Sequence, residues 1–207
     1  MLDIKKNTAL IAAIVLVIAL IFAGLTARPK FQSPEVILKE APLEKNSELM
    51  ITPGEQYVYG YLYNNTTANI TYSIASGGGC TLITVENSPD GRMLCLDKEG
   101  LDETGSNSTF SDPSILFFKP WMLALEESWR WNNSVYIRYD DIIQHTSDTY
   151  YKVIRSENYR GREVFVVRID SSSGPAEYLW IDKEKRVLLK VVGEGYQVEL
   201  FEGIELD

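Results

Sequence analysis

Residues 150–201 decide the fold, and they read YYKVIRSENYRGREVFVVRIDSSSGPAEYLWIDKEKRVLLKVVGEGYQVELF. Apolar and polar residues alternate with a period of two in five runs, the pattern typical of β-strands with one buried face. Turn residues separate the runs at Asn158 to Gly161, at Ser171 to Pro175 and at Asp182 to Lys185. The segment therefore predicts a β-meander of five antiparallel strands.

The alternation also predicts which side chains face the core. Phe165 and Val167 share one side of their strand, and Leu189 and Val191 share one side of another. The charged Arg168 points the other way, as expected for a sheet with one buried and one solvated face.

Two hairpins are predicted before the meander. EQYVYGYLY and NITYSIA flank a turn at Asn64 to Ala68, which indicates the first hairpin. Cys80 and Cys95 bracket the second, with a turn cluster at Asn87 to Gly91 between two apolar runs. We expect the cysteines to form a disulfide worth about 3 kcal/mol in an oxidising compartment. A free buried pair is the alternative.

The central segment predicts a helix, because Lys119-Pro120 opens the stretch PWMLALEESWRW, which ends at Trp131. Its apolar residues fall on one stripe at i, i+4 and i+8. The stripe either packs against the sheet as core or lines an apolar pocket. The pocket candidates, with two residues from the sheet, are Trp121, Met122, Leu125, Trp129, Phe165 and Val167.

The N-terminal part predicts a membrane anchor. Residues from Thr8 to Leu25 carry no charge, and as a helix they would span about 27 Å, roughly one hydrocarbon core. We expect a cytoplasmic tail at 1–7, a transmembrane helix at 8–27, a proline-rich stalk at 28–53 and an outer β-rich domain at 54–207. A cleaved secretory signal is the alternative for the apolar segment.

Glycosylation sequons agree with export. Five asparagines head an Asn-x-Ser/Thr pattern, more than chance predicts, which indicates a glycosylated protein outside the cytoplasm. Accidental sequons in an intracellular protein are the alternative. The candidate acceptors are Asn64, Asn65, Asn69, Asn107 and Asn132.

Charge and motifs exclude several function classes. With 20 basic and 29 acidic residues, the chain has a formal net charge of −9 and is a poor partner for nucleic acid.

Low glutamine with abundant Glu and Lys is a composition found in thermophile proteins. The sequence has no HExxH, GxSxG, CxxC or phosphate-binding loop, and its one histidine is His145. We therefore expect no enzyme, no metal site and no cofactor.

The segments GREVFVVRID and EYLWIDKEKRVLLKV resemble the LolA/LppX-like family of lipoprotein and lipid carriers. The matching residues are Trp180, Ile181, Asp182 and Leu188 to Lys190. The resemblance implies a curved, incomplete β-barrel covered by helices, with an apolar ligand inside. This chain departs from the family in its anchor, its sequons and the lack of a lipobox cysteine. A tethered protein cannot shuttle between membranes, so the resemblance implies local capture or handoff.

The sequence thus predicts an α+β protein: a transmembrane helix, then a curved and mostly antiparallel sheet with a short helical insertion. The first functional hypothesis is a half-barrel pocket that binds an apolar ligand, a lipid or a partner's apolar segment. It predicts a cavity of a few hundred Å³ between helix and sheet. The alternatives are a structural subunit of a cell-envelope assembly, such as a surface-layer contact, stator or pilin-like protein, and an extracytoplasmic enzyme.

Overall fold

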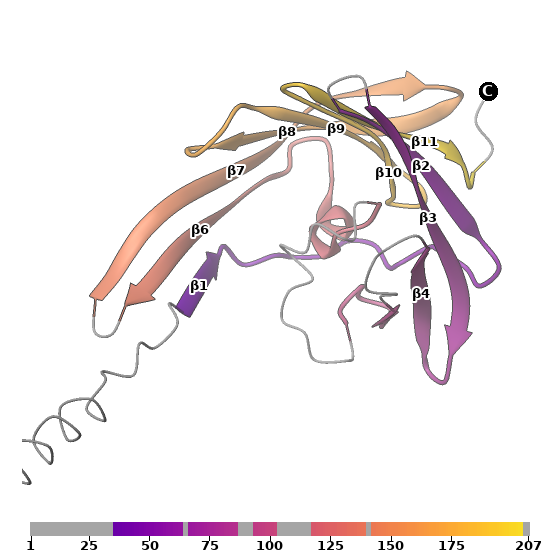
Figure 1. Cartoon of the computed structure of the whole chain (residues 1–207), viewed down its shortest axis with the longest axis horizontal. Helices are drawn as coiled ribbons and strands as arrows, with labels where there is room; N and C mark the ends of the chain where they lie inside the picture. The colour runs from indigo at the N-terminus through magenta and orange to yellow at the C-terminus, as the bar shows by residue number, and fades with distance from the viewer. Residues whose placement is uncertain (1–34, 64–65, 87–92, 103–116, 140–141, 205–207) are drawn as a thin grey trace, which may run out of the picture.

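The structure is a computed structural model that describes residues 35–63, 66–86, 93–102, 117–139 and 142–204 (Figure 1). These residues form one open sheet of antiparallel strands and a single 3-10 helix. The predicted curved antiparallel sheet is confirmed, but the described part is almost entirely β rather than α+β. None of its helical residues forms a helix long and apolar enough to cross a membrane. The predicted anchor at 8–27 lies outside the described residues.

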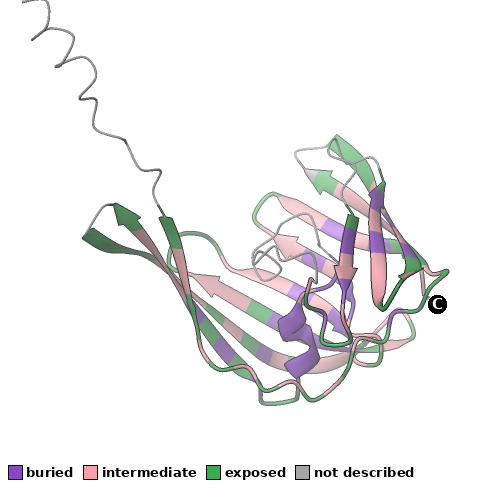
Figure 2. Cartoon of the chain, turned by 90° about the horizontal axis from the view of Figure 1, so that it is seen from below, coloured by how far each residue is buried: buried purple, intermediate pink, exposed green. Residues whose placement is uncertain are grey.

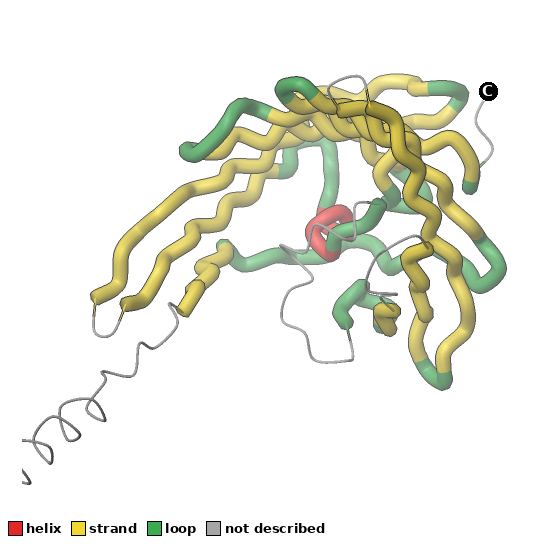
Figure 3. Tube along the Cα trace, viewed as in Figure 1, coloured by secondary structure: helices red, strands yellow, loops and turns green. Residues whose placement is uncertain are grey.

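The sheet has eleven strands in the order β1-β6-β7-β8-β9-β10-β11-β2-β3-β4-β5. It curves into an arch, and the helix η1 lies under its concave side (Figures 1 and 3). The elements are β1 (Glu35–Glu40), β2 (Gln56–Tyr63), β3 (Thr66–Gly77), β4 (Cys80–Glu86), β5 (Met93–Leu96), η1 (Pro120–Ala124), β6 (Arg130–Tyr139), β7 (Ile142–Tyr159), β8 (Arg162–Ser171), β9 (Glu177–Asp182), β10 (Leu188–Gly193) and β11 (Tyr196–Glu202).

The predicted meander is confirmed as β7 to β11, which are consecutive neighbours in the sheet. Its first turn is Arg160-Gly161, and both residues have positive φ, at 50° and 78°. Two left-handed residues in a two-residue hairpin loop match the right-handed twist of the flanking strands. Glycine adopts this conformation at little cost, so Gly161 suits the position.

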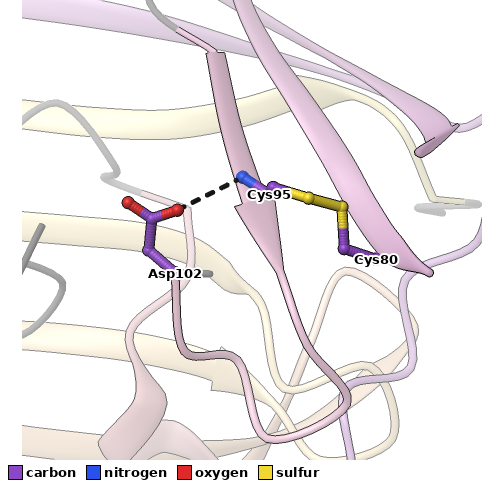
Figure 4. Close-up of a disulfide and its surroundings, with 3 residues drawn as sticks. All are labelled: Cys80, Cys95 and Asp102. Atoms are coloured by element: carbon purple, nitrogen blue, oxygen red, sulfur yellow. Dashed lines mark hydrogen bonds between the residues drawn. A yellow bond between two sulfur atoms is a disulfide. The ribbon is translucent and has the colours of Figure 1, made fainter. Parts of the chain in front are cut away.

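The two earlier hairpins are also confirmed, as β2-β3 and β4-β5. Cys80 and Cys95 form the expected disulfide, with a Cα to Cα distance of 5.5 Å (Figure 4). The Cys95 backbone N–H also donates a hydrogen bond to Asp102 Oδ1 at 3.4 Å. The disulfide therefore ties β5, the last strand of the sheet order, to β4.

The predicted helix ending at Trp131 is wrong. Helical structure stops at Ala124, Leu125 is extended with ψ of 134°, and β6 begins at Arg130. The reason is tertiary: Trp131 pairs with Tyr151 in the sheet, and Trp129 stacks on Trp131 with 6.4 Å between ring centroids. A helix of only two or three turns is marginally stable alone, so packing against the sheet decides the conformation of this segment.

The expected stalk at 28–53 also needs correction, because its described part belongs to the folded domain. Residues 35–40 form β1, which pairs with β6, and the N–H groups of Asn46 and Ser47 donate to the Leu123 carbonyl at 3.0 and 3.1 Å. Of the prolines that indicated a linker, Pro42 is compatible with this structure. Pro42 comes directly after Ala41, whose N–H donates a hydrogen bond to the Asn132 carbonyl. The missing N–H of Pro42 therefore interrupts no hydrogen bond between β1 and β6.

Most of the core lies on the concave side of the sheet, where η1 and the strands facing it are buried (Figure 2), and Val164 and Val166 of β8 are also buried on the other face. Aromatic side chains fill much of it; Tyr57, Tyr59, Tyr72, Phe117 and Phe118 are at most 1% exposed. The Tyr59 hydroxyl donates to the Leu188 carbonyl at 2.6 Å, which satisfies a phenol that would otherwise be costly to bury.

One half-buried ion pair, Lys185 with Glu55, predicts acid sensitivity. Burial opposes the charge on Glu55, but hydrogen bonds from Lys185, Tyr57 and Thr52 outweigh it and lower the pKa of Glu55 to about 2. A carboxyl whose pKa is lower in the folded than in the unfolded state stabilises the fold above the unfolded pKa. That contribution is lost as the pH falls from about 5 to about 2.

Glu55→Gln is therefore expected to lower stability at pH 7 by on the order of 2 kcal/mol and to flatten the loss of stability below pH 5. Urea unfolding between pH 2 and pH 7 measures this dependence. Lys185→Met removes the main hydrogen-bond donor and should flatten the same pH range. An unchanged slope in both variants would contradict the role of this pair.

Candidate ligand-binding site

A pocket of about 340 Å³ lies between η1 and the concave face of the sheet. Its walls come from six strands that are consecutive neighbours, from β7 through β11 to β2, and from the chain around η1. The lining residues are Tyr61, Lys119, Trp121, Met122, Tyr151, Ile169, Glu177, Leu179, Leu188, Val191, Tyr196 and Val198.

Cross-strand pairing builds the apolar floor of the pocket. Val198 pairs with Tyr61 on one side and with Val191 on the other, and Val191 pairs with Leu179. Directly paired residues in antiparallel strands share a face, so this row projects into the same space from four strands.

A β-bulge in β10 adds one more residue to the floor. The register shifts between Leu188 and Lys190, so Leu188 lines the pocket together with Val191 although simple alternation would separate them. Lys190 lies on the opposite face, where its ammonium is 5.6 Å from the Tyr159 ring and 5.5 Å from the Trp180 ring.

Aromatic rings form the side walls. Tyr61 and Tyr196 stack with 6.4 Å between ring centroids, and Trp121 contacts Tyr151 at 5.2 Å. Trp121 also stacks on Trp129 at 5.6 Å, which holds the η1 side of the pocket in place. Such flat, rigid side chains suit the apolar part of a ligand.

Few polar groups reach the pocket. Lys119 and Glu177 are its charged lining residues. Burial raises the pKa of the Tyr196 phenol, and its hydrogen bond to Glu177 raises that pKa further. Burial also raises the pKa of Tyr151, which is hydrogen-bonded to Asn133. Both phenols are therefore neutral at pH 7, and the pocket combines an apolar floor with one amine and one carboxylate.

The structure divides the predicted pocket residues into two groups. Trp121 and Met122 line the pocket. Leu125, Trp129, Phe165 and Val167 are buried in the core but are not among its lining residues. Phe165 lies on the predicted face but further along the strand, where the Lys183 ammonium and the Arg186 guanidinium are 4.9 and 5.1 Å from its ring.

Sequence reasoning missed most of the floor and the aromatic wall formed by Tyr61 and Tyr196. The available signal was the alternation of Tyr57, Tyr59 and Tyr61, which places three aromatic residues on one face of β2. That pattern does not show that β2 lies beside β11, because the two strands are far apart in sequence.

The sequon asparagines in the described residues, Asn69 and Asn132, are both exposed. Asn69 pairs with Gly60, which precedes the pocket residue Tyr61, and Asn132 follows the concave-side Trp131. Because neighbours along a strand point to opposite faces, both asparagines lie on the convex face. Asn64, Asn65 and Asn107 lie outside the described residues. Glycans on Asn69 and Asn132 would leave the pocket uncovered.

The single histidine lies on the convex face, away from the pocket. His145 Nε2 is 2.9 Å from Asp148 Oδ1, and the Ser134 hydroxyl donates to the same oxygen at 2.6 Å. These contacts lower the pKa of Asp148. The carboxylate stands between the hydroxyl and the imidazole, so this arrangement places no base against the hydroxyl as nucleophilic catalysis requires. In the described ranges, no group of three or more His, Cys, Asp or Glu side chains could hold a metal ion.

Comparison of the sequence with protein-family models and with curated proteins finds no match. The pocket geometry is therefore the basis for assigning a function.

Proposed function

We propose that this chain is a membrane-tethered binding protein that holds an apolar ligand on the concave face of its half-barrel. The observation that carries this proposal is the 340 Å³ pocket, whose apolar floor extends over neighbouring strands and whose lining includes only two charged side chains. Such a site is typical of small-molecule binding: concave, mostly apolar and with a few polar groups to orient the ligand.

The size of the pocket limits the ligand. Ligand pockets usually measure about 300–1,000 Å³, so this one suits a single acyl chain or a compact ring system. Each methylene group buried there contributes about 0.8 kcal/mol before the cost of association is subtracted. Lys119 and Glu177 would face the polar end of such a ligand.

Other features support a site outside the cytoplasm. A disulfide is typical of oxidising compartments, and the described sequon asparagines are exposed on the face opposite the pocket. An anchor at 8–27 would keep the domain at the membrane surface. The open, curved sheet with a concave apolar pocket also favours a LolA/LppX-like carrier, in this case one restricted to local capture and handoff.

Val191→Trp is expected to reduce bound ligand by about tenfold, because the larger side chain would occupy part of the pocket that the ligand needs. The full chain is purified from its own membranes in mild detergent. Native mass spectrometry then records its mass before and after organic extraction. The matched control is Val192→Trp, since Val192 pairs with Tyr178 on the convex face and should leave the bound mass unchanged.

The wild-type protein should carry an extractable mass that the Val191→Trp variant lacks. A wild-type mass explained by protein and glycan alone would contradict ligand binding. That result would favour the alternative of a structural subunit in an envelope assembly, whose partners are neighbouring proteins.

A further inference from the structure

A second apolar surface lies where β1 and β6 pair with each other and with β7, at residues 35–40, 133–139 and 142–148. Most of its apolar side chains come from β1 and β6, and β7 adds Ile142 together with the polar Gln144 and Ser147. We call this region the arm; it extends away from η1 (Figure 1). Val36 pairs with Ile137, Leu38 with Val135, and Tyr139 with Ile142. These residues share a face by pairing and by alternation. The apolar strip of the arm consists of Val36, Leu38, Val135, Ile137, Tyr139 and Ile142.

The strip lies on the concave side of the sheet. Counting by twos along β6 from Trp131, which packs in the core, leads through Asn133 to Val135, Ile137 and Tyr139. The bulge beside Val135 is in β7, so it does not break the alternation in β6.

The strip is open to solvent. Val36 is 68% exposed, Ile142 is 70% exposed and Tyr139 is 50% exposed. Leu38, Val135 and Ile137 are half-buried. Clustered large apolar side chains at such exposure are uncommon on a monomeric soluble protein and mark an interaction surface.

The opposite face of the arm is mostly polar and internally paired, although Ile37, Tyr136 and Ile143 also lie on it. Arg138 forms an ion pair with Glu35 at 2.8 Å, and Lys39 lies 5.1 Å from the Tyr136 ring centroid. The Ser134, Asp148 and His145 cluster and the sequon Asn132 lie on the same face. The arm is therefore two-faced, with water and glycan expected on one side and an apolar partner on the other.

The strip lies between the pocket and the point where the chain enters the domain. Beyond the inner end of the strip, Trp131 pairs with Tyr151, which lines the pocket. The paired polar residues Asn133 and Glu40 lie between Trp131 and the strip. At its outer end, β1 begins at Glu35. The apolar segment 8–25 ends nine residues earlier, and those nine residues can span at most about 30 Å.

We propose that acyl chains from the bilayer around residues 8–25 lie against the apolar strip, which is the path by which an amphiphile moves between membrane and pocket. This inference rests on the proposed function and on the predicted anchor. A second copy of the chain paired along β1 is a less suitable occupant. Three of the six residues of that edge strand are charged, a pattern that opposes edge-to-edge pairing.

The test places a nitroxide label on the full chain in phosphatidylcholine vesicles, at Ile142→Cys in the strip or at Ile143→Cys on the opposite face. The pair is matched, because both residues are exposed isoleucines in consecutive positions. Vesicles without net charge suit the sequence, since residues 140 and 141 between the strands are aspartates. Electron paramagnetic resonance then measures collisions of each label with lipid-soluble oxygen and with a water-soluble nickel complex.

Collisions with the nickel complex are expected to be about tenfold fewer at position 142 than at position 143, with oxygen favoured at position 142, because water is excluded from lipid. Equal access of the nickel complex to both labels would overturn the proposal. Equal protection of both labels would also overturn it, since the tip would then insert as a whole.

Ligand mass is measured on the same samples, so the two proposals fail separately. If the label at position 142 is protected but the protein carries no ligand, the membrane contact of the strip is supported and the proposed ligand-binding function fails. If the protein carries ligand but both labels are exposed to water, the proposed ligand-binding function is supported and the path along the strip fails.

Discussion

Asp182→Ala is expected to lower the free energy of unfolding by about 3–5 kcal/mol, the largest effect of a single charged side chain that we predict. The Asp182 side chain is only 1% exposed. It accepts hydrogen bonds from Arg162 Nε at 2.8 Å and from the backbone N–H groups of Glu184 and Lys185 at 3.0 and 2.6 Å. Its removal would leave the two backbone N–H groups and Arg162 Nε without this buried acceptor in the turn between β9 and β10, while Arg162 keeps its hydrogen bond to Glu184 at 3.0 Å.

The matched control is Asp170→Ala. Asp170 accepts from Arg168 Nε at 2.9 Å, but both side chains are more than two-fifths exposed, so the loss should stay below about 1 kcal/mol. Chemical denaturation followed by circular dichroism compares the two variants. Equal losses would show that burial of Asp182 does not set the strength of its interactions.

Trp121→Ala is expected to cost about 3–5 kcal/mol, because it removes a large buried side chain and leaves a cavity. Trp121 is 3% exposed, and its ring contacts both Trp129 and Tyr151. The same change enlarges the pocket on its η1 side, so ligand retention should fall together with stability.

Two controls separate packing from ligand contact. Trp180→Ala removes a half-buried ring from the convex face and should cost no more than about 2 kcal/mol without changing ligand retention. Trp121→Phe keeps an aromatic ring and should recover part of both properties. Full ligand retention in Trp121→Ala, measured by native mass spectrometry, would show that Trp121 is not part of the binding site.

The proposals assign different roles to the two faces of one sheet. The convex face carries the exposed sequon asparagines and the ion pairs of the arm, whereas the concave face carries the pocket and the apolar strip. An outer face with exposed asparagines and an inner face with an apolar pocket can coexist because side chains alternate along every strand. The alternation of side chains thus places the polar, solvent-facing residues and the proposed ligand-binding residues on opposite faces of the same sheet.

Local patterns predicted much of the sheet. Alternation around Phe165 and Val167 and the turns that follow identified the meander, since a period of two and turn residues need no distant partner. The disulfide was predictable for the same reason, because Cys80 and Cys95 belong to one hairpin. Trp121 and Met122 were pocket candidates because they belong to the apolar stripe of the predicted helix, and both line the pocket.

The remaining features depend on contacts between distant residues. Trp129 and Trp131 matched a helical stripe, yet pairing with β7 makes Trp131 part of a strand. Val36 and Leu38 lay in a proline-rich segment, and only pairing with β6, about 100 residues away in sequence, makes them part of the sheet.

The sequence by itself determined the strands of the meander and the disulfide, because each depends on residues close together along the chain. The tertiary structure alone decided which strands are neighbours, where the bulges fall and therefore which side chains meet in the pocket and the strip. Register is a property of pairs of strands, and one residue of shift moves every following side chain to the other face.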